Sequence, residues 1–409
     1  MTTHFDFETH VDRRGTGCVK WDAPLPYGIT LTPQQRKRLI PLWVADMDFV
    51  AAPFIREALQ KRLDHGVFGY TIVHDSYYEA VIRWFRERHN LELKREWFLH
   101  STGVVPELTA VVKAFCAPGE GVIIQSPVYN CFFSSIQKNG CRITDVPLLR
   151  KDLSDGRFTY QMDFDGLEAA CADPGNRLLL LCNPHNPAGR RWSEAELRRI
   201  GDIALKHGVP VIADEIHCEI ARPGTKYTPF ASLSNAFRRE SVTLSSPSKS
   251  FNTAGLHMAN IVAERPDWRE KIRKVIEVNE IGEINPFGAV SVEAAYSPEG
   301  VLWLEGLNQT VWCNYEMLVE RFGEALPDFP VCELEATYLA WVDISASGLS
   351  AEEIEAQLIQ SEQVWINAGK MYGDDRFIRV NLACPSTLMR EGIDRLVNGL
   401  SALSKRHLP

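Results

Sequence analysis

Residues 178–215 read LLLLCNPHNPAGRRWSEAELRRIGDIALKHGVPVIADE, and this stretch decides the fold. The apolar run Leu178–Cys182 predicts a buried strand, and Pro210–Ala213 predicts a second one. The segment Glu194–His207 between them opens with a capping box, shows apolar residues at helical spacing and is followed by a glycine. A strand–loop–helix–strand unit of this kind implies two parallel strands joined by a right-handed crossover.

The same pattern continues on both sides of this unit. Further short apolar strands are predicted at Gly121–Gln125, Val242–Ser245 and Ala259–Ala263. Apolar strands that alternate with helices indicate an α/β domain with a mainly parallel sheet, because both faces of such a sheet are covered. We place this large domain at residues 49–290.

A second, smaller α+β domain is predicted from the rest of the chain. A long helix is expected at Pro298–Ala325, where apolar residues recur at helical spacing. Strands follow at Tyr338–Ile344 and Phe377–Leu382, with a helix at Ala351–Gln360 between them. We expect residues 291–409 to form this domain together with residues 1–48.

Composition narrows the class of protein. The chain has 409 residues, 45% of them hydrophobic, and a net charge of 44 − 53 = −9, so it is neither disordered nor a general nucleic-acid binder. No apolar run is long enough to span a membrane, and the acidic N-terminus does not resemble a secretion signal. The ten cysteines form no C-x-x-C pair, which predicts no metal site and favours the reducing cytoplasm.

Four motifs directly follow predicted strands or begin a helix, where ligands of parallel α/β sheets bind. Residues 101–108, STGVVPEL, place a proline in the first turn of a helix, and the amides of that helix N-terminus would form an anion site. An ordinary loop-to-helix junction is the alternative. Residues 183–189, NPHNPAG, form a rigid polar loop that suits ligand contact or is simply a turn.

The other two motifs carry ionisable side chains. Asp214 ends an apolar run, so its carboxylate needs a cation or donors if it is buried; capping a helix is the alternative. Lys249 lies in SPSKSFN, residues 246–252, between hydroxyl residues. A lysine whose pKa is lowered by burial can form a Schiff base, whereas an exposed loop lysine would have no such role.

Taken together and in this order, these motifs resemble those of the aspartate aminotransferase superfamily (fold type I) of pyridoxal phosphate enzymes. The resemblance covers nearly the whole chain, including PLWVADMDF at 41–49 and FIRVNLACP at 377–385. The strings LWVADMDF, ADEIHCE and SPSKSFN are most similar to those of the MalY/PatB-type cystathionine β-lyases. The resemblance implies a seven-stranded large-domain sheet and pyridoxal 5′-phosphate as the cofactor.

It also implies roles around the cofactor ring. Lys249 would form an imine with the cofactor aldehyde and later act as a base on the substrate Cα–H. Asp214 would keep the pyridine nitrogen protonated, and Asn186 would donate to the phenolate oxygen. Tyr129, in the string SPVY, would stack on the ring and belong to the catalytic set, unless it is a core tyrosine. His217 replaces a tyrosine of many aminotransferases and would contact the phenolate oxygen or merely pack.

The cofactor phosphate and the substrate involve further residues by the same resemblance. Backbone amides and hydroxyls would hold the phosphate, namely those of Gly103, Val104, Val105, Ser246 and Ser248. His257 stands where many relatives have a phosphate-binding arginine, so one strong contact is missing. Tyr70 would reach the phosphate of the partner subunit, which implies a homodimer. Arg379 would bind the substrate carboxylate, helped by the backbone of Val44 and Ala45.

The expected reaction is carbon–sulfur β-elimination. Cystathionine or a related cysteine S-conjugate would give a thiol, pyruvate and ammonia. The alternative is an aminotransferase that transfers the amino group to a 2-oxo acid, because both reactions begin with a carbanion at Cα. Ile281–Phe287 and Tyr338 are expected near the group beyond the sulfur. The implied partners are a small-molecule thioether substrate and a second copy of the chain, with neither nucleic acid nor membrane.

Overall fold

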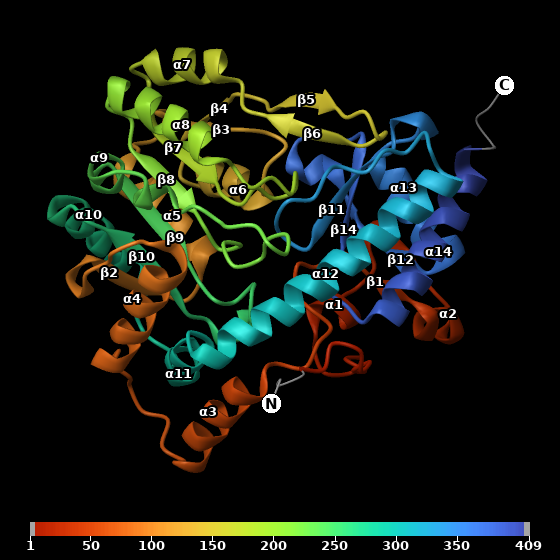
Figure 1. Cartoon of the computed structure of the whole chain (residues 1–409), viewed down its shortest axis with the longest axis horizontal. Coiled ribbons are helices and arrows are strands. Elements are labelled where there is room, and N and C mark those ends of the chain that lie inside the picture. The colour runs from red at the N-terminus through yellow and green to blue at the C-terminus, as the bar shows by residue number, and fades with distance from the viewer. Residues whose placement is uncertain (1–4, 405–409) are drawn as a thin grey trace.

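The structure, a computed structural model, describes residues 5–404, and its central feature is a sheet of seven strands with helices on both faces (Figure 1). The strands lie in the order β2-β10-β9-β8-β7-β3-β4. Neighbours are parallel except at β10, which runs antiparallel to β2 and β9. The strand bounds are β2 Phe98–Ser101, β3 Gly121–Ile124, β4 Arg142–Asp145, β7 Asn176–Cys182, β8 Val211–Asp214, β9 Ser241–Ser245 and β10 Ala259–Ala263.

The prediction of a mainly parallel α/β sheet is confirmed. Each apolar run quoted above for the large domain forms a strand whose ends lie within about two residues of the predicted ones. The sequence patterns missed the edge strands β2 and β4. In β4 the side chains of Arg142 and Asp145 at the two ends are exposed, so no apolar run marks the strand.

The two faces of the sheet are covered by different helices. In β3, Val122 and Ile124 pack with the side chains of α5, α6 and α10, whereas Ile123 packs with those of α7, α8 and α9. Helix α8 has the predicted bounds, because Ser193 and Glu196 form the capping box and Gly208 takes the left-handed conformation after the last turn. The helix bounds are α5 Val104–Phe115, α6 Asn130–Lys138, α7 Phe164–Ala172, α8 Glu194–His207, α9 Asn235–Arg239 and α10 Pro266–Val278.

The C-terminal part contains a three-stranded antiparallel sheet, in the order β11-β14-β13, and the long helix α12 crosses the molecule toward it from α11 (Figure 1). The expected helices and strands of this part are all present. Their bounds are α11 Pro286–Ala295, α12 Pro298–Ala325, β11 Leu339–Asp343, α13 Ala351–Glu362, β12 Val364–Trp365, β13 Asn367–Ala368, β14 Phe377–Asn381 and α14 Ser386–Ser404.

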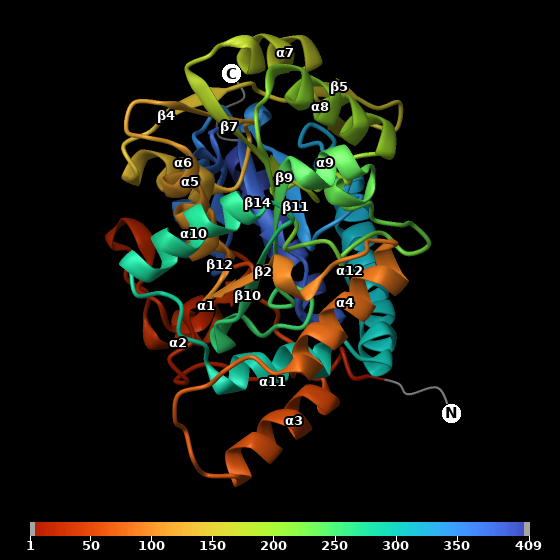
Figure 2. The same ribbon diagram turned by 90° about the vertical axis from the view of Figure 1, so that its left-hand side faces the viewer.

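The N-terminal segment joins this C-terminal part, because β1 pairs in parallel with β12. Further along the chain, α3 packs against α11 at the lower end of the molecule (Figure 2). The remaining bounds are α1 Val19–Asp22, α2 Pro33–Arg38, β1 Ile40–Pro41, α3 Pro53–Asp64, α4 Asp75–His89, β5 Leu149–Asp152 and β6 Phe158–Gln161, with 3₁₀ turns at Pro26–Gly28, Arg95–Trp97, Phe230–Ser232, Ala254–Leu256, Ser345–Ser347 and Gly369–Tyr372.

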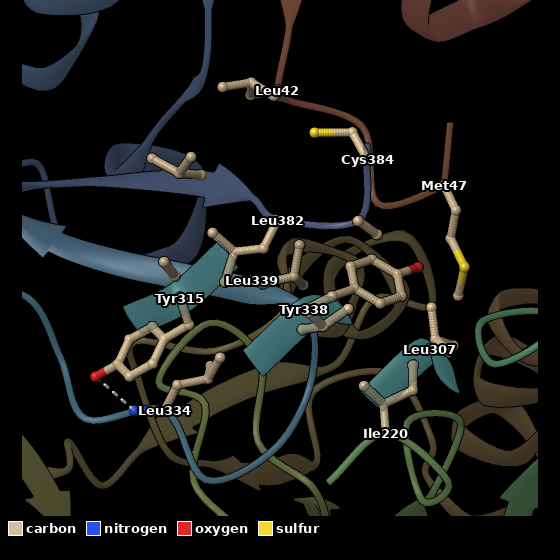
Figure 3. Close-up of a cluster of buried hydrophobic side chains, with 14 of the residues drawn as sticks. Leu42, Met47, Ile220, Leu307, Tyr315, Leu334, Tyr338, Leu339, Leu382 and Cys384 are labelled. Carbon is tan, nitrogen blue, oxygen red and sulfur yellow. Dashed lines mark hydrogen bonds between the residues drawn. The ribbon is translucent and has the colours of Figure 1, made fainter. Parts of the chain in front are cut away.

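A large apolar core links these N- and C-terminal elements. Leu42 and Met47, on the chain after β1, pack around Tyr338, Leu382 and Cys384 (Figure 3). All five side chains are fully buried. Burying a large apolar side chain stabilises a fold by about 1.5–3 kcal/mol, so the segment after β1 is anchored firmly to the C-terminal sheet.

The division into domains at residues 49 and 290 stays a prediction. The two sheets occupy the sequence positions expected for a large and a small domain, while one apolar core runs through elements on both sides of these limits. All ten cysteines are free thiols. Within residues 5–404 no helix combines the length and the apolar composition that a membrane span requires.

Candidate active site

A cavity of about 580 Å³ lies at the carboxyl ends of β7, β8 and β9. Such an edge is where parallel α/β sheets bind ligands. The cavity is lined by all but one of the residues predicted to hold the cofactor or the substrate carboxylate: Val44, Ala45, Gly103, Val104, Val105, Tyr129, Asn186, Asp214, His217, Ser246, Ser248, Lys249 and Arg379. Tyr70 is the exception; it lies in the loop between α3 and α4 and is 97% exposed.

Lys249 lies in the turn that follows β9, and its amine faces the cavity. Nζ donates a hydrogen bond to the carbonyl oxygen of Ala45 at 2.7 Å. Burial and the nearby positive charge of Arg379 together lower the pKa of Lys249 to about 8, while the carboxylates of Asp46 and Asp214 oppose the shift. A larger share of the amine is therefore neutral near pH 7 than in an exposed lysine, and a neutral amine can react with an aldehyde.

Asp214 ends β8 and is almost fully buried. Its Oδ1 accepts a hydrogen bond from the amide of Ile216 at 3.2 Å. Burial raises the pKa of Asp214 to about 6, while that amide and the nearby Lys249 oppose the rise. A carboxylate this poorly solvated favours a cationic partner, and a protonated pyridine nitrogen meets that need.

Arg379 projects from β14 and is held in a defined orientation. One terminal nitrogen, Nη2, donates to the carbonyl oxygen of Trp43 at 3.0 Å, and Nη1 donates to Oδ1 of Asn186 at 3.1 Å. The guanidinium carbon lies 4.7 Å from the centre of the Tyr372 ring. Because Oδ1 of Asn186 is occupied by Arg379, its Nδ2 is the atom that can donate to a ligand.

The N-terminus of α5 forms another wall of the cavity. Gly103 precedes the helix, and the first amides of an α-helix have no partner inside it, which suits a phosphate. Nδ1 of His257 lies 3.3 Å from the carbonyl oxygen of Thr102, so Nδ1 carries the proton in this contact. Ser246 donates to the carbonyl oxygen of Met258 at 2.8 Å, which occupies the hydroxyl proton predicted for the phosphate.

Tyr129 and His217 complete the cavity wall. Tyr129 precedes α6, and burial together with the nearby Cys131 thiol raises the pKa of its phenol, which stays protonated. His217 is buried, and burial lowers its pKa, so the ring is neutral. Within residues 5–404, Nδ1 of His217 has no hydrogen-bond partner. The ring also packs edge-to-face on Tyr338, with 5.7 Å between ring centres.

Sequence reasoning missed several residues of the cavity. Asn367, Met371 and Tyr372 come from the segment between β12 and β14 and line the side near Arg379. No motif marks them, since the tertiary fold alone brings this segment to the cavity. Residues 282–284, expected near the substrate, line a separate surface hollow beside Tyr70. Tyr338 does not line the cavity; its hydroxyl donates to the Ala45 carbonyl oxygen at 2.9 Å.

The chemistry of these groups fits pyridoxal 5′-phosphate. A helix N-terminus suits the phosphate, a buried carboxylate suits a protonated ring nitrogen, and an amine of lowered pKa suits the aldehyde. Residues 37–396 match the family described as Aminotransferase class I and II, and the chain belongs to that family. It is therefore a pyridoxal-phosphate enzyme of fold type I.

Within that class the chain is similar to carbon–sulfur lyases. It is 39% identical over 399 residues to Cystathionine beta-lyase PatB of Bacillus subtilis (strain 168), covering 97% of this chain and 100% of the relative. It is 31% identical over 402 residues to Protein MalY of Escherichia coli (strain K12), covering 98% and 100%. The structure of cystalysin from Treponema denticola, which contains pyridoxal 5′-phosphate, matches with a TM-score of 0.91 and 35% identity, covering 98% and 100%. The resemblance seen in the sequence motifs is confirmed.

Proposed function

We propose that this protein is a pyridoxal-phosphate-dependent carbon–sulfur β-lyase that converts cystathionine or a related cysteine S-conjugate to a thiol, pyruvate and ammonia. The observation that carries the proposal is that Lys249, Asp214 and Arg379 line one cavity, in a chain similar over its length to a cystathionine β-lyase.

Arg379 has the geometry to bind and orient the substrate. A guanidinium recognises a carboxylate with two parallel hydrogen bonds, and Trp43 and Asn186 already fix the plane of this one. The substrate α-carboxylate bound there would bring Cα toward Lys249, since both side chains line the same cavity. Asn186 contacts Arg379 and also lines the cavity, so it links carboxylate binding to cofactor binding.

Lys249 and Asp214 would handle the protons. With a pKa of about 8, the Lys249 amine can take the Cα proton at near-neutral pH. Asp214 keeps a proton on the ring nitrogen, and the bound cofactor supplies a positively charged ring that accepts the electron pair left on Cα. Tyr129 stays a neutral phenol because burial raises its pKa, so it can donate a proton to the departing sulfur.

An aminotransferase is the second candidate, because the family includes such enzymes and the same three residues serve both reactions. A product assay distinguishes them. Purified, cofactor-saturated protein is given cystathionine without a 2-oxo acid, and pyruvate, ammonia and free thiol are quantified. Equal release of all three over many turnovers supports the lyase. Turnover only after 2-oxoglutarate is added would replace the proposal with an aminotransferase.

We also propose that the enzyme is a homodimer in which Tyr70 reaches the phosphate of the partner. The loop that carries Tyr70 exposes several large apolar side chains, which a second copy would cover: Val67, Phe68, Tyr70 and Ile72. Light scattering of the purified protein tests the dimer. Tyr70→Phe should weaken cofactor binding several-fold while the dimer persists. A monomeric, fully active enzyme would refute this assembly.

The cytoplasm is the compartment that we propose for the enzyme. Ten free thiols, among them the exposed Cys313, suit a reducing environment. Fractionation of the producing cells tests this location, and recovery of the protein outside the cytoplasm would contradict it.

A further inference from the structure

A cluster of charged side chains near the N-terminus lies outside the cavity. The side chains of Lys20 and Asp48 are 0% and 2% exposed, and Nζ lies 2.6 Å from Oδ2. Trp21 donates from Nε1 to Oδ1 of the same carboxylate at 2.8 Å. Arg13 adds a third donor to Asp48 at 2.7 Å and pairs with Asp46 at 2.7 Å. A buried charge that loses its partner is strongly destabilising, so the side chains of this cluster must keep their relative positions.

These side chains hold one segment of irregular backbone, residues 43–48, which we call the strap. Besides its bonds to Asp46 and Asp48, Arg13 donates to the carbonyl oxygen of Met47 at 2.9 Å. Lys20 donates to the carbonyl oxygen of Asp46 at 3.2 Å. The strap itself forms neither helix nor strand. Its position is therefore fixed by hydrogen bonds from side chains and not by the backbone hydrogen bonds of a helix or sheet.

The other side of the strap faces the active site. Its successive carbonyl oxygens accept hydrogen bonds from several side chains, among them Arg379 on Trp43, Asn381 on Val44 and Lys249 on Ala45. The strap also meets the turn that carries Lys249, because Asn252 exchanges hydrogen bonds of 3.0 and 2.9 Å with the backbone of Met47. A shift of the strap would thus move the carboxylate-binding guanidinium and the reactive lysine together.

We propose that the N-terminal cluster acts as a clasp on the strap, which makes Arg13 and Lys20 positioning residues for substrate binding although neither lines the cavity. The inference deepens the proposed function and rests on it, since it assumes that Arg379 binds the substrate carboxylate. The physical reason is that the carbonyl oxygen of Trp43 in the strap fixes the plane of the Arg379 guanidinium, so a displaced strap would misalign the two hydrogen bonds that receive the carboxylate.

The first test is Arg13→Ala, because Arg13 is partly exposed and its loss leaves the buried pair intact. We expect KM for the thioether to rise about tenfold while kcat stays within about threefold, since positioning of the carboxylate is lost before the chemistry is. Arg13→Lys, which keeps the charge but not the planar fork, should lie between the two. Amide hydrogen exchange in residues 43–48 should become faster in Arg13→Ala.

A second variant separates positioning from folding. Lys20→Met combined with Asp48→Asn removes both charges of the buried pair and keeps an Oδ1 acceptor for Trp21 Nε1, and loss of a whole buried ion pair is often neutral for stability. The double variant should keep its thermal unfolding temperature, yet show the raised KM and the faster exchange in the strap. Arg238→Ala is the matched control, because Arg238 and Glu264 form a pair of similar exposure away from the cavity. It should change neither KM nor exchange in residues 43–48.

The outcomes are distinct. Unchanged KM and unchanged exchange in Arg13→Ala would overturn the clasp, even if the enzyme proves to be a lyase. A rise in KM equal to that in Arg238→Ala would also overturn it, since general destabilisation would then explain the effect. A wild-type protein that releases no pyruvate but shows faster strap exchange on loss of Arg13 would refute the proposed function and keep the clasp as a structural device.

Discussion

The active-site cavity and a second hollow beside α4 are similar in size, about 580 and 520 Å³, and both border buried ionisable side chains. In the second hollow, Glu219 accepts hydrogen bonds from Trp84 and His89 at 2.6 Å each. Arg88 donates to its other oxygen at 2.9 Å. Despite burial, His89 and Arg88 hold the pKa of Glu219 at about 2.

The carboxylate of Asp214, in the active-site cavity, has fewer hydrogen-bond donors, and its pKa is shifted in the opposite direction. Among the described residues, the Asp214 carboxylate has a single hydrogen-bond donor, the amide of Ile216, and burial raises its pKa to about 6. Lys249 has a lowered pKa in the same cavity. In these two hollows, the carboxylate that the protein satisfies fully has a structural role, and the carboxylate left short of donors is the one that a ligand would complete. His89, Cys218 and Glu219 have ligand atoms within 4.8 Å of one another, but Arg88 already supplies the positive charge there.

The largest effect is expected for a substitution in the active-site cavity, at Lys249. Lys249→Ala should lower the rate of pyruvate release by about a thousandfold or more, since the proposed function uses the amine both as cofactor anchor and as general base. The unfolding temperature of the cofactor-free protein should change little, because the amine makes one hydrogen bond, to Ala45. Lys206→Ala, at an exposed surface pair, is the control and should keep full activity. Retention of more than a tenth of the rate in Lys249→Ala would contradict the assignment.

For Glu219, in the second hollow, we expect the opposite result: a loss of stability with nearly unchanged activity. Glu219→Gln should lower the free energy of unfolding by about 3 kcal/mol, because it leaves the Arg88 guanidinium without its charged partner and replaces an acceptor that His89 and Trp84 share. Its kcat/KM should stay within about twofold of the wild type. Denaturant unfolding and steady-state kinetics measure the two quantities.

Asp214→Asn is the mirror image of this variant. It should lower activity by about a hundredfold and leave the free energy of unfolding unchanged or raised by about 1 kcal/mol, since a poorly solvated carboxylate is removed. If both variants lost stability and activity alike, the contrast between the two hollows would have no basis.

A pH profile sharpens the contrast further. Because the pKa of Lys249 is lowered to about 8, the neutral amine gains population as pH rises and dominates above that value. The rate of covalent attachment of the cofactor to the cofactor-free protein should therefore rise about tenfold per pH unit below pH 8 and level off above it. Stopped-flow absorbance of the cofactor follows this rate.

Arg379 provides the control for this profile. Its charge contributes to the lowered pKa of Lys249, so Arg379→Leu should move the midpoint to higher pH. A midpoint near 10.5 in the wild type, the ordinary value for lysine, would refute the effect of burial.

The smallest effect concerns the phosphate end of the cavity. His257→Arg should lower the dissociation constant for pyridoxal 5′-phosphate about three- to tenfold, because a guanidinium offers the phosphate two parallel charge-assisted hydrogen bonds. Fluorescence titration of the cofactor-free protein measures this constant. His257→Gln should not tighten binding, and an unchanged constant in His257→Arg would show that the phosphate lies out of reach of this position.

Local chemistry made much of the fold predictable. Helix α8 has the predicted bounds because its capping box and the glycine after its last turn are signals between neighbouring residues. The strands of the sheet interior were found because both of their faces are buried, which favours short runs rich in apolar residues. Edge strand β4 was missed because it is largely exposed. Tyr70 could be proposed from its motif, but the contact proposed for it lies between two subunits, and a single chain does not contain it.

The sequence by itself determined the candidates for the chemistry, because Lys249 and Asp214 stand at the ends of apolar strands and Arg379 stands within an alternating one, all in short motifs that resemble those of the family. Only the tertiary structure decided what surrounds them. Lys249 meets the Ala45 carbonyl across 204 residues, and Arg379 meets that of Trp43 across 336. No local pattern encodes such contacts, since backbone carbonyls are the same in every residue. These contacts arise because the strap packs between the N-terminal cluster and the C-terminal sheet, and this packing fixes the direction of its carbonyl oxygens.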